Sequence, residues 1–483
     1  MAGQTAAPPA RNSDSTWVLV LASAANLMVA LDALVVSTAL TEIGRDLGAS
    51  IEALEWTVNA YTLSFAGFLL TAAVLGDRFG RRRLFVAGLV LFVAASAACA
   101  LASSIGWLIA ARALQGVGAA IVMPLALAQI SAAFPPERRG WALGIYSSTA
   151  GLSTVLGPIV GGVVTDGLAW RWIFWVNLPL GLAAAGLAVA RLRETFGAKA
   201  AMDLPGLLLA TCGAFGLVWG LVRANAAGWG SLEVLASLAG GALSVPLLVA
   251  WELRSAQPMI PMRFFRLRAF AAGNAAMFFL NGALMSAIFF MAQFLQAALG
   301  AGPLGAGLRL LPWGVAVILG ARNAVGFAKR FGDAAAIALG LAVQAAGLAW
   351  IALIADPGMA YVGLIPPMIL AGAGFAVAVT IAQKAVVGSV AIADIGKASG
   401  TLSTIRQLGG AFGVALTVAV FARAGSHATP MAFSQGFAAA TGVAAVLSLA
   451  GAGAGLFLPA TRAKAHIGPL AGAAPVSSHG DKA

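Results

Sequence analysis

Long apolar stretches recur along this chain from Trp17 almost to Leu458, separated by short polar breaks. Each stretch is close to the roughly 20 residues that a helix needs to cross the hydrocarbon core of a bilayer. In that core only helices and closed barrels satisfy their own backbone hydrogen bonds. Of all residues, 60% are hydrophobic and 10% are charged, whereas soluble domains average about 25% charged residues. The chain is therefore predicted to be an all-α membrane protein that crosses the bilayer many times.

Charged breaks divide the apolar sequence into fourteen expected helices. They are placed near 17–39, 56–76, 84–103, 107–133, 141–164, 172–190, 204–222, 234–251, 270–295, 305–325, 335–355, 361–383, 399–421 and 437–458. Arginine and lysine gather in the loops on one side, and the opposite loops hold only Arg45, Arg171, Arg223 and Arg423. Because basic loops stay in the cytoplasm, this asymmetry predicts that both termini are cytoplasmic, in a bacterial inner membrane. The formal net charge of +12 is thus a topology signal, and no nucleic-acid recognition motif accompanies it.

An internal repeat supports this organisation. Two matches share one offset along the chain: Arg78-Phe79-Gly80 with Arg330-Phe331-Gly332, and Gly157 and Gly161 with Gly409 and Gly413. Duplicated helical bundles that rock about a central site are a common transporter architecture. The expected domains are a polar cytoplasmic N-terminus (1–16), a six-helix bundle (17–190), an inserted helix pair (203–253), a second six-helix bundle (270–458) and a disordered cytoplasmic tail (459–483).

A short loop rich in arginine joins the second and third expected helices. Gly80 permits a tight reversal there, and Asp77 can bond free helix N–H groups or pair with an arginine. Arg78 and Arg81 would hold the loop at anionic headgroups. The loop is interpreted as a conformational latch, and the alternative is a basic loop without a specific role.

Two charged residues expected inside the membrane are candidates for proton coupling. Arg112 lies in the fourth helix with Gln115 one turn away, and Asp32 is the only acidic residue expected deep within a span. A charge in the bilayer is costly, so both should face the bundle interior and find partners there. Burial disfavours an ionised carboxyl group, which makes Asp32 the candidate proton carrier and Arg112 the group that helps to expel the proton. Purely structural hydrogen bonds between helices are the alternative for both residues.

Glycines in the fifth expected helix indicate close helix packing. The residues concerned are Gly151, Gly157, Gly161 and Gly162, together with Pro158, which removes a backbone donor and bends the segment. Glycines four residues apart let a neighbouring helix backbone approach closely. Such a helix suits packing that must re-form in two states, and static close packing is the alternative.

Together these motifs resemble the major facilitator superfamily, and within it the fourteen-helix branch of drug:proton antiporters. The resemblance covers almost the whole chain and is carried by Leu31 to Leu40, the Asp77 loop, residues 112–118, Gly157 to Gly162, Trp170 to Pro179 and Gly400 to Gly413. It departs at Ala73, where the loop motif usually opens with glycine, and at Lys329, which stands opposite Asp77 in the second half. The resemblance implies two six-helix bundles plus two inserted helices, and a fifth-helix motif typical of antiporters.

Polar and soft side chains within the spans are candidates for a central substrate cavity. They are Asn59, Tyr61, Gln115, Phe278, Asn281, Met285, Gln293 and Arg406. Aromatic and methionine side chains accommodate varied ligands. For any one of these residues, lipid-facing or core packing is the alternative.

The predicted function is export of small amphiphilic drugs or toxic metabolites in exchange for protons, by alternating access. The expected partners are the substrate, protons and the bilayer; the proton gradient supplies the energy, and no cofactor is expected. The alternatives are an uptake symporter or uniporter and, less favoured, a membrane-embedded enzyme or receptor. The histidines, His427, His466 and His479, lie in loops or the tail, and the two cysteines lie in apolar stretches. Neither a catalytic cluster nor a metal site is therefore indicated, and no Gly-Lys-Ser/Thr phosphate loop is present.

Overall fold

The computed structural model describes residues 12–196, 203–255, 258, 260–390 and 394–459. Across these residues the regular structure is helical, without a β-strand. The elements in chain order are α1 (Asn12–Leu47), α2 (Ile51–Phe79), α3 (Arg81–Ala100), α4 (Ile105–Ala133), α5 (Pro136–Gly167), α6 (Trp172–Trp175), α7 (Asn177–Arg191), α8 (Leu204–Ala227), α9 (Leu232–Arg254), η1 (Met262–Arg266), α10 (Arg268–Ala297), α11 (Pro303–Arg309), α12 (Leu311–Phe331), α13 (Asp333–Ile354), η2 (Tyr361–Leu364), α14 (Ile365–Gly388), α15 (Ile395–Ala424) and α16 (Pro430–Leu456). Most of the expected polar N-terminus and nearly all of the expected tail lie outside the described residues.

The polar breaks end the helices by ordinary capping chemistry. Ser50, Ser104 and Thr429 each accept a hydrogen bond from the backbone N–H three residues further on, as N-cap side chains do. Gly80 and Gly332 adopt φ values of +107° and +88° between successive helices. Only glycine enters this region without a steric cost, so the repeat detected in the sequence reappears as the same backbone reversal in both halves.

Twelve described helical segments are long and apolar enough to cross a membrane. Two of them, which were expected to be single helices, are broken: Trp172–Arg191 into α6 and α7, and Pro303–Phe331 into α11 and α12. Each break lies just before a proline, Pro179 or Pro312, whose missing N–H cannot bond the preceding turn. α2 and α5, with 29 and 32 residues, are not among the twelve, so the expected count of fourteen is not confirmed.

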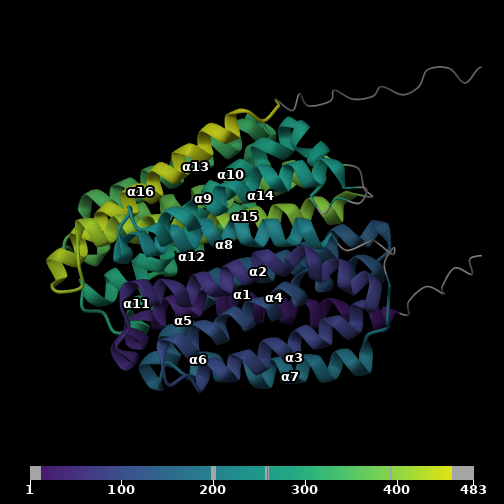
Figure 1. The fold of residues 1–483 in the computed structure, drawn as a ribbon, viewed down its shortest axis with the longest axis horizontal. Coiled ribbons are helices and arrows are strands. Elements are labelled where there is room, and N and C mark those ends of the chain that lie inside the picture. Colours follow the sequence, from purple (N-terminus) through teal and green to yellow (C-terminus); the bar gives the residue numbers. More distant parts are fainter. Residues whose placement is uncertain (1–11, 197–202, 256–257, 259, 391–393, 460–483) are drawn as a thin grey trace, which may run out of the picture.

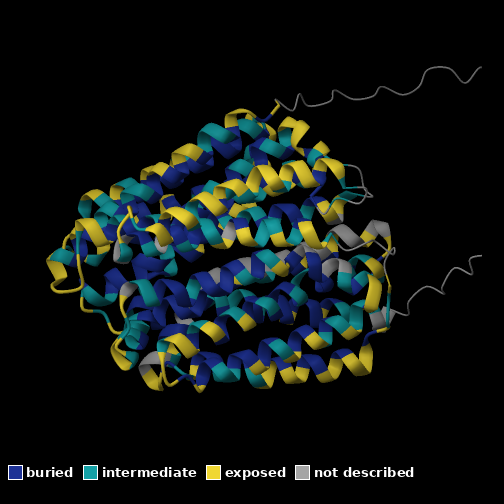
Figure 2. Cartoon of the chain, in the orientation of Figure 1, coloured by how far each residue is buried: buried dark blue, intermediate teal, exposed yellow. Residues whose placement is uncertain are grey.

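The helices form two groups that lie side by side (Figure 1). The first group is α1–α7 and the second is α10–α16; they meet where α2 contacts α15, α5 contacts α11 and α12, and α1 contacts α10. α8 and α9 pack against each other, and α8 also contacts α2 and α15, one helix from each group. Buried residues line the inner faces, while α9 is exposed along most of its length (Figure 2). Apolar side chains on such an outer surface suit a lipid environment.

Candidate functional site

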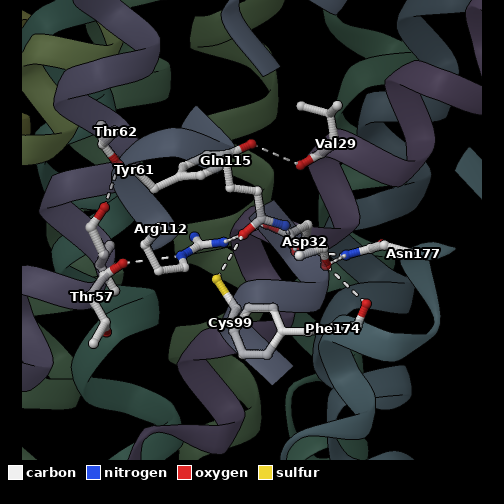
Figure 3. A network of polar contacts seen from close by, with 12 residues as sticks. Val29, Asp32, Thr57, Tyr61, Thr62, Cys99, Arg112, Gln115, Phe174 and Asn177 are labelled. Carbon is white, nitrogen blue, oxygen red and sulfur yellow. Dashed lines mark hydrogen bonds and ion pairs between the residues drawn. The ribbon is translucent and has the colours of Figure 1, made fainter. Parts of the chain in front are cut away.

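An ion pair between Asp32 of α1 and Arg112 of α4 lies at the centre of the first group of helices (Figure 3). Arg112 Nη1 lies 2.5 Å from Asp32 Oδ2, and both side chains are 1% exposed. Arg112 Nε donates to the backbone oxygen of Thr57 at 3.1 Å. The guanidinium also lies 4.2 Å from the ring centroid of Tyr61, within cation–π range. The sequence prediction that these two charges face the bundle interior is met in the structure.

Two amides complete the shell around the carboxylate. Gln115 Nε2 and Asn177 Nδ2 each donate to Asp32 Oδ1 at 2.8 Å, and Gln115 Oε1 accepts from Arg112 Nη1 at 2.8 Å. Asn177 also donates to Ser96 Oγ at 3.1 Å. The network therefore joins α1, α2, α3, α4 and α7 around one carboxylate.

The arrangement suits an ionised Asp32, since Arg112, Gln115 and Asn177 all act as donors to it. Removing one partner of a buried ion pair typically costs about 3–5 kcal/mol, because the remaining charge is uncompensated. A proton bound to Asp32 would leave the buried charge of Arg112 uncompensated.

The loop between α2 and α3 contains the predicted latch. Arg81 Nε donates to Asp77 Oδ1 at 2.8 Å, so Asp77 pairs with an arginine rather than capping a helix. The exposed Arg78 lies over the ring of its neighbour Phe79. Gly80 forms the reversal between the two helices.

A residue from a distant loop caps α3 in place of Asp77. Glu194, which follows α7, accepts from the backbone N–H groups of Arg82 and Arg83 at 2.9 and 3.2 Å. A carboxylate is favoured at a helix N-terminus by the helix dipole and the free N–H groups. A side chain at Gly80 would collide with this carboxylate, at 2.7 Å. The loop is thereby fastened to the end of α7 within its own half.

Glycines of α5 lie directly against α1. A Cβ atom at Gly157 would lie 2.8 Å from Leu34 Cβ. A Cβ atom at Gly161 would lie 2.9 Å from the backbone oxygen of Val35 and would also overlap Thr38 Oγ1. These helices are therefore in the close contact that the glycine spacing predicts.

The next glycine of α5 faces the other half of the molecule. A Cβ atom at Gly162 would lie 2.6 Å from the backbone oxygen of Pro303 and 2.8 Å from Leu304 Cα, both in α11. α5 thus carries one glycine face toward its own bundle and one toward the second bundle. Gly151 and Pro158 also lie in α5, but the surroundings of their side-chain positions lie outside the described part of the structure.

The second half repeats the glycine contact. A Cβ atom at Gly409 of α15 would lie 2.7 Å from the backbone carbon of Phe278 in α10, and one at Gly413 would lie 2.5 Å from Gly282 Cα. α15 therefore relates to α10 as α5 relates to α1. The repeated glycines occupy equivalent contacts in the two halves.

Seven of the eight predicted cavity residues separate into three sets. Tyr61 and Gln115 belong to the ion-pair network. Gln293 donates to the backbone of its own helix, at Phe289, and is 2% exposed, so it is a core residue here. A third set, at the junction of α10 and α15, consists of Phe278, Asn281, Met285 and Arg406.

Asn59 belongs to a feature that the sequence interpretation missed. Its Nδ2 donates to Glu55 Oε1 at 3.0 Å, and Glu55 is 1% exposed. The expected second helix began at 56, whereas α2 begins at Ile51, so Glu55 was not expected within a span. Glu55 is therefore a second buried acid, near the start of α2, that the sequence interpretation did not identify. The four-residue spacing of Glu55 and Asn59 was the signal available in the sequence.

A separate groove lies where α8 meets α2 and α4. Its volume is about 560 Å³ and its lining includes Trp56, Phe215 and Trp219. The rings of Trp56 and Trp219 are 5.2 Å apart. At one end of the groove Arg223 pairs with Glu52 at 3.1 Å. The predicted cavity residues do not line this groove.

Sequence comparison matches residues 22–414 to the family model described as Major Facilitator Superfamily. The cephamycin export protein CmcT of Amycolatopsis lactamdurans is 37% identical over 85% of this chain and 86% of its own length. The tetracenomycin C resistance and export protein of Streptomyces glaucescens is 35% identical over 83% of this chain and 75% of its own. The multidrug resistance protein Stp of Mycobacterium tuberculosis is 33% identical over 85% of this chain and 76% of its own length.

Solved structures share the fold at low sequence identity. An auto-inhibited POT family peptide transporter superposes with a TM-score of 0.68 and 14% identity, covering 92% of this chain and 96% of that one. A bacterial homologue of the human lysosomal transporter Spinster was solved in an inward-facing and unoccupied conformation. It superposes with a TM-score of 0.64 and 16% identity, covering 93% of this chain and 97% of that one. At this level of identity the likeness concerns the fold alone.

Proposed function

We propose that this chain, which belongs to the Major Facilitator Superfamily, exchanges protons for small amphiphilic drugs or toxic metabolites. Its relatives are resistance and export proteins, which supports a drug exporter. The observation that carries the proton coupling is the buried ion pair of Asp32 and Arg112, enclosed by two amide donors. No cofactor is invoked, because the proton gradient supplies the energy.

In the proposed cycle, Asp32 binds a proton from outside when the pair with Arg112 opens. Conformational change then exposes the site to the cytoplasm, where re-formation of the ion pair expels the proton. One inward proton is worth about 2.3 kcal/mol per 100 mV of membrane potential, and each 1.4 kcal/mol corresponds to a tenfold ratio. One proton per cycle can thus sustain an outward concentration ratio of tens.

Uptake is the second candidate direction, and two observations disfavour it. Two of the relatives named for a compound are export proteins, and the α5 glycines that resemble the antiporter motif lie in close helix contacts. The peptide transporters among the structural neighbours carry no weight here, since they share the fold at 14% identity.

Susceptibility profiling tests the exporter function directly. A host that lacks its own pumps should tolerate higher concentrations of a subset of antibiotics when it expresses this protein, and a protonophore should remove that protection. Accumulation of the same compounds in expressing cells, relative to the empty vector, would establish uptake instead. Protection that persists in the presence of the protonophore would overturn proton coupling.

We also propose fourteen spans with both termini in the cytoplasm. Reporters fused after α7 and at the C-terminus are expected to read cytoplasmic, because the basic loops lie on that side. A reporter inserted at Gly230, between α8 and α9, is expected to read external. An external C-terminus would mean an odd number of spans and would contradict the arrangement of two equal bundles plus a helix pair.

A further inference from the structure

Arg406 of α15 is a membrane-embedded cation, and no residue that the structure describes serves as its counter-ion. Its backbone oxygen accepts from Asn281 Nδ2 at 2.8 Å, but within the described residues its guanidinium has neither a hydrogen-bond acceptor nor a carboxylate partner. By contrast, the buried Arg112 of α4 has Asp32, Gln115 and a backbone oxygen as partners. Ionisable residues inside a membrane are costly and usually paired, so an unpaired one indicates a partner that arrives from elsewhere.

Arg406 lies where the two halves face each other. Its helix contacts α2 of the opposite half, and Thr404, two residues before it, donates through Oγ1 to the backbone oxygen of Ala66 at 3.4 Å. Arg406 lies eleven positions from the first residue of α15, or roughly 17 Å at 1.5 Å per residue. Arg406 is partly exposed at this depth, so its side chain is open to a ligand rather than sealed in the core.

The surroundings of Arg406 are apolar and aromatic. On α10, Asn281 and Met285 face Gly410, where an added Cβ would lie 2.7 Å from Asn281 Nδ2 and 3.0 Å from Met285 Cγ. The rings of Phe278 and Phe412 lie 5.5 Å apart beside them. Arg406 therefore lies one to two turns along α15 from aromatic and thioether groups, which form a soft apolar wall close to one strong anion-binding element.

We infer that Arg406 binds the carboxylate of the transported compound, so that amphiphilic acids are the preferred substrate class. This inference rests on the proposed export function and adds the charge of the substrate. A guanidinium binds a carboxylate through two parallel N–H···O bonds, while the apolar part of the acid contacts the phenylalanines and Met285. An outgoing monoanion is also driven outward by an inside-negative membrane potential, which adds to the drive from the incoming proton.

The test compares an acid with its uncharged analogue on the purified full-length protein. Pyrenebutyric acid and pyrenebutanol share one fluorescent ring system and differ in the carboxylate. Wild-type protein is expected to bind the acid more tightly than the alcohol. Arg406→Gln should weaken binding of the acid by roughly ten- to a hundredfold, the range for a hydrogen-bonded charged group, and should leave the alcohol unchanged. Arg406→Lys should retain part of the preference, since it keeps the charge but loses the planar fork.

Arg423→Gln is the matched control, because Arg423 lies at the exposed outer end of the same helix. It removes the same charge and should leave both affinities unchanged. Equal binding of acid and alcohol by the wild-type protein would overturn the inference, whatever the stability of the variants. An equal loss of both ligands in Arg406→Gln would show a structural role instead. Resistance confined to cationic and neutral antibiotics would also overturn it while leaving the export function intact.

Discussion

Asp32→Asn is expected to abolish export driven by a proton gradient while the protein stays at normal levels in the membrane. Asparagine has the size of aspartate, and its single amide oxygen can still accept either from Arg112 or from Gln115 and Asn177, but it has no ionisable oxygen and cannot carry a proton. Substrate binding should be retained. Asp32→Glu, which keeps the carboxyl group on a longer side chain, should retain part of the activity. The measurement is substrate flux in proteoliposomes under an imposed pH gradient.

Two further variants make the Asp32 experiment specific. Asp46→Asn removes a carboxylate from the same helix, where Asp46 is exposed and pairs with Arg171 at 2.7 Å, and it should leave flux intact. Because Asp32→Asn strands the charge of Arg112, a double variant with Arg112→Gln controls for misfolding; it removes both charges and should insert normally yet remain uncoupled. Coupled flux at the wild-type level in Asp32→Asn would exclude Asp32 from the proton path.

Gly161→Leu is expected to eliminate transport without preventing membrane insertion. Its Cβ would lie 2.9 Å from the backbone oxygen of Val35, and a backbone atom cannot rotate away as a side chain can. α5 and α1 would have to separate, and overpacking of this kind typically costs about 1–3 kcal/mol. Efflux measured against the amount of folded protein in the membrane reports the effect.

The control for the glycine contact is Gly186→Leu. Gly186 lies within α7, is exposed, and has no atom within 4 Å of an added Cβ, so leucine should be tolerated there. Gly413→Leu should reproduce the defect of Gly161→Leu, because Gly413 meets the backbone of α10 at the equivalent contact. Normal efflux by both Gly161→Leu and Gly413→Leu would show that neither close contact is needed for transport.

The parts of the site that could be predicted from the sequence are those where the membrane environment restricts which contacts a residue can make. A buried Asp32 and a buried Arg112 each need a partner, and with so few charges in the spans they become each other's partner. Glycine spacing likewise predicts close packing at Gly161 and Gly413, because only a missing side chain permits it. In both cases a local property of the sequence determines a contact between helices.

Other parts of the site depend on contacts between distant residues or on the absence of a partner, and no local sequence pattern predicts these. Asn177 reaches Asp32 only because α7 begins beside α3, after the helix break before Pro179. Glu194 caps a helix that begins more than a hundred residues earlier. Gln293 bonds its own helix rather than a cavity, since an isolated amide in an apolar span bonds the nearest backbone oxygen when no other partner is near.

The polar network around Asp32 is drawn entirely from helices α1–α7, whereas Asn281 and Arg406 belong to α10 and α15. On the proposed function, the two duplicated halves have diverged into one half that uses the proton and one half that recognises the transported compound. Selection for a new compound can then act on α10 and α15 without disturbing the machinery that uses the proton. A chimaera that joins the first half of this chain to the second half of a relative is expected to keep this chain's coupling and to acquire the relative's spectrum of compounds.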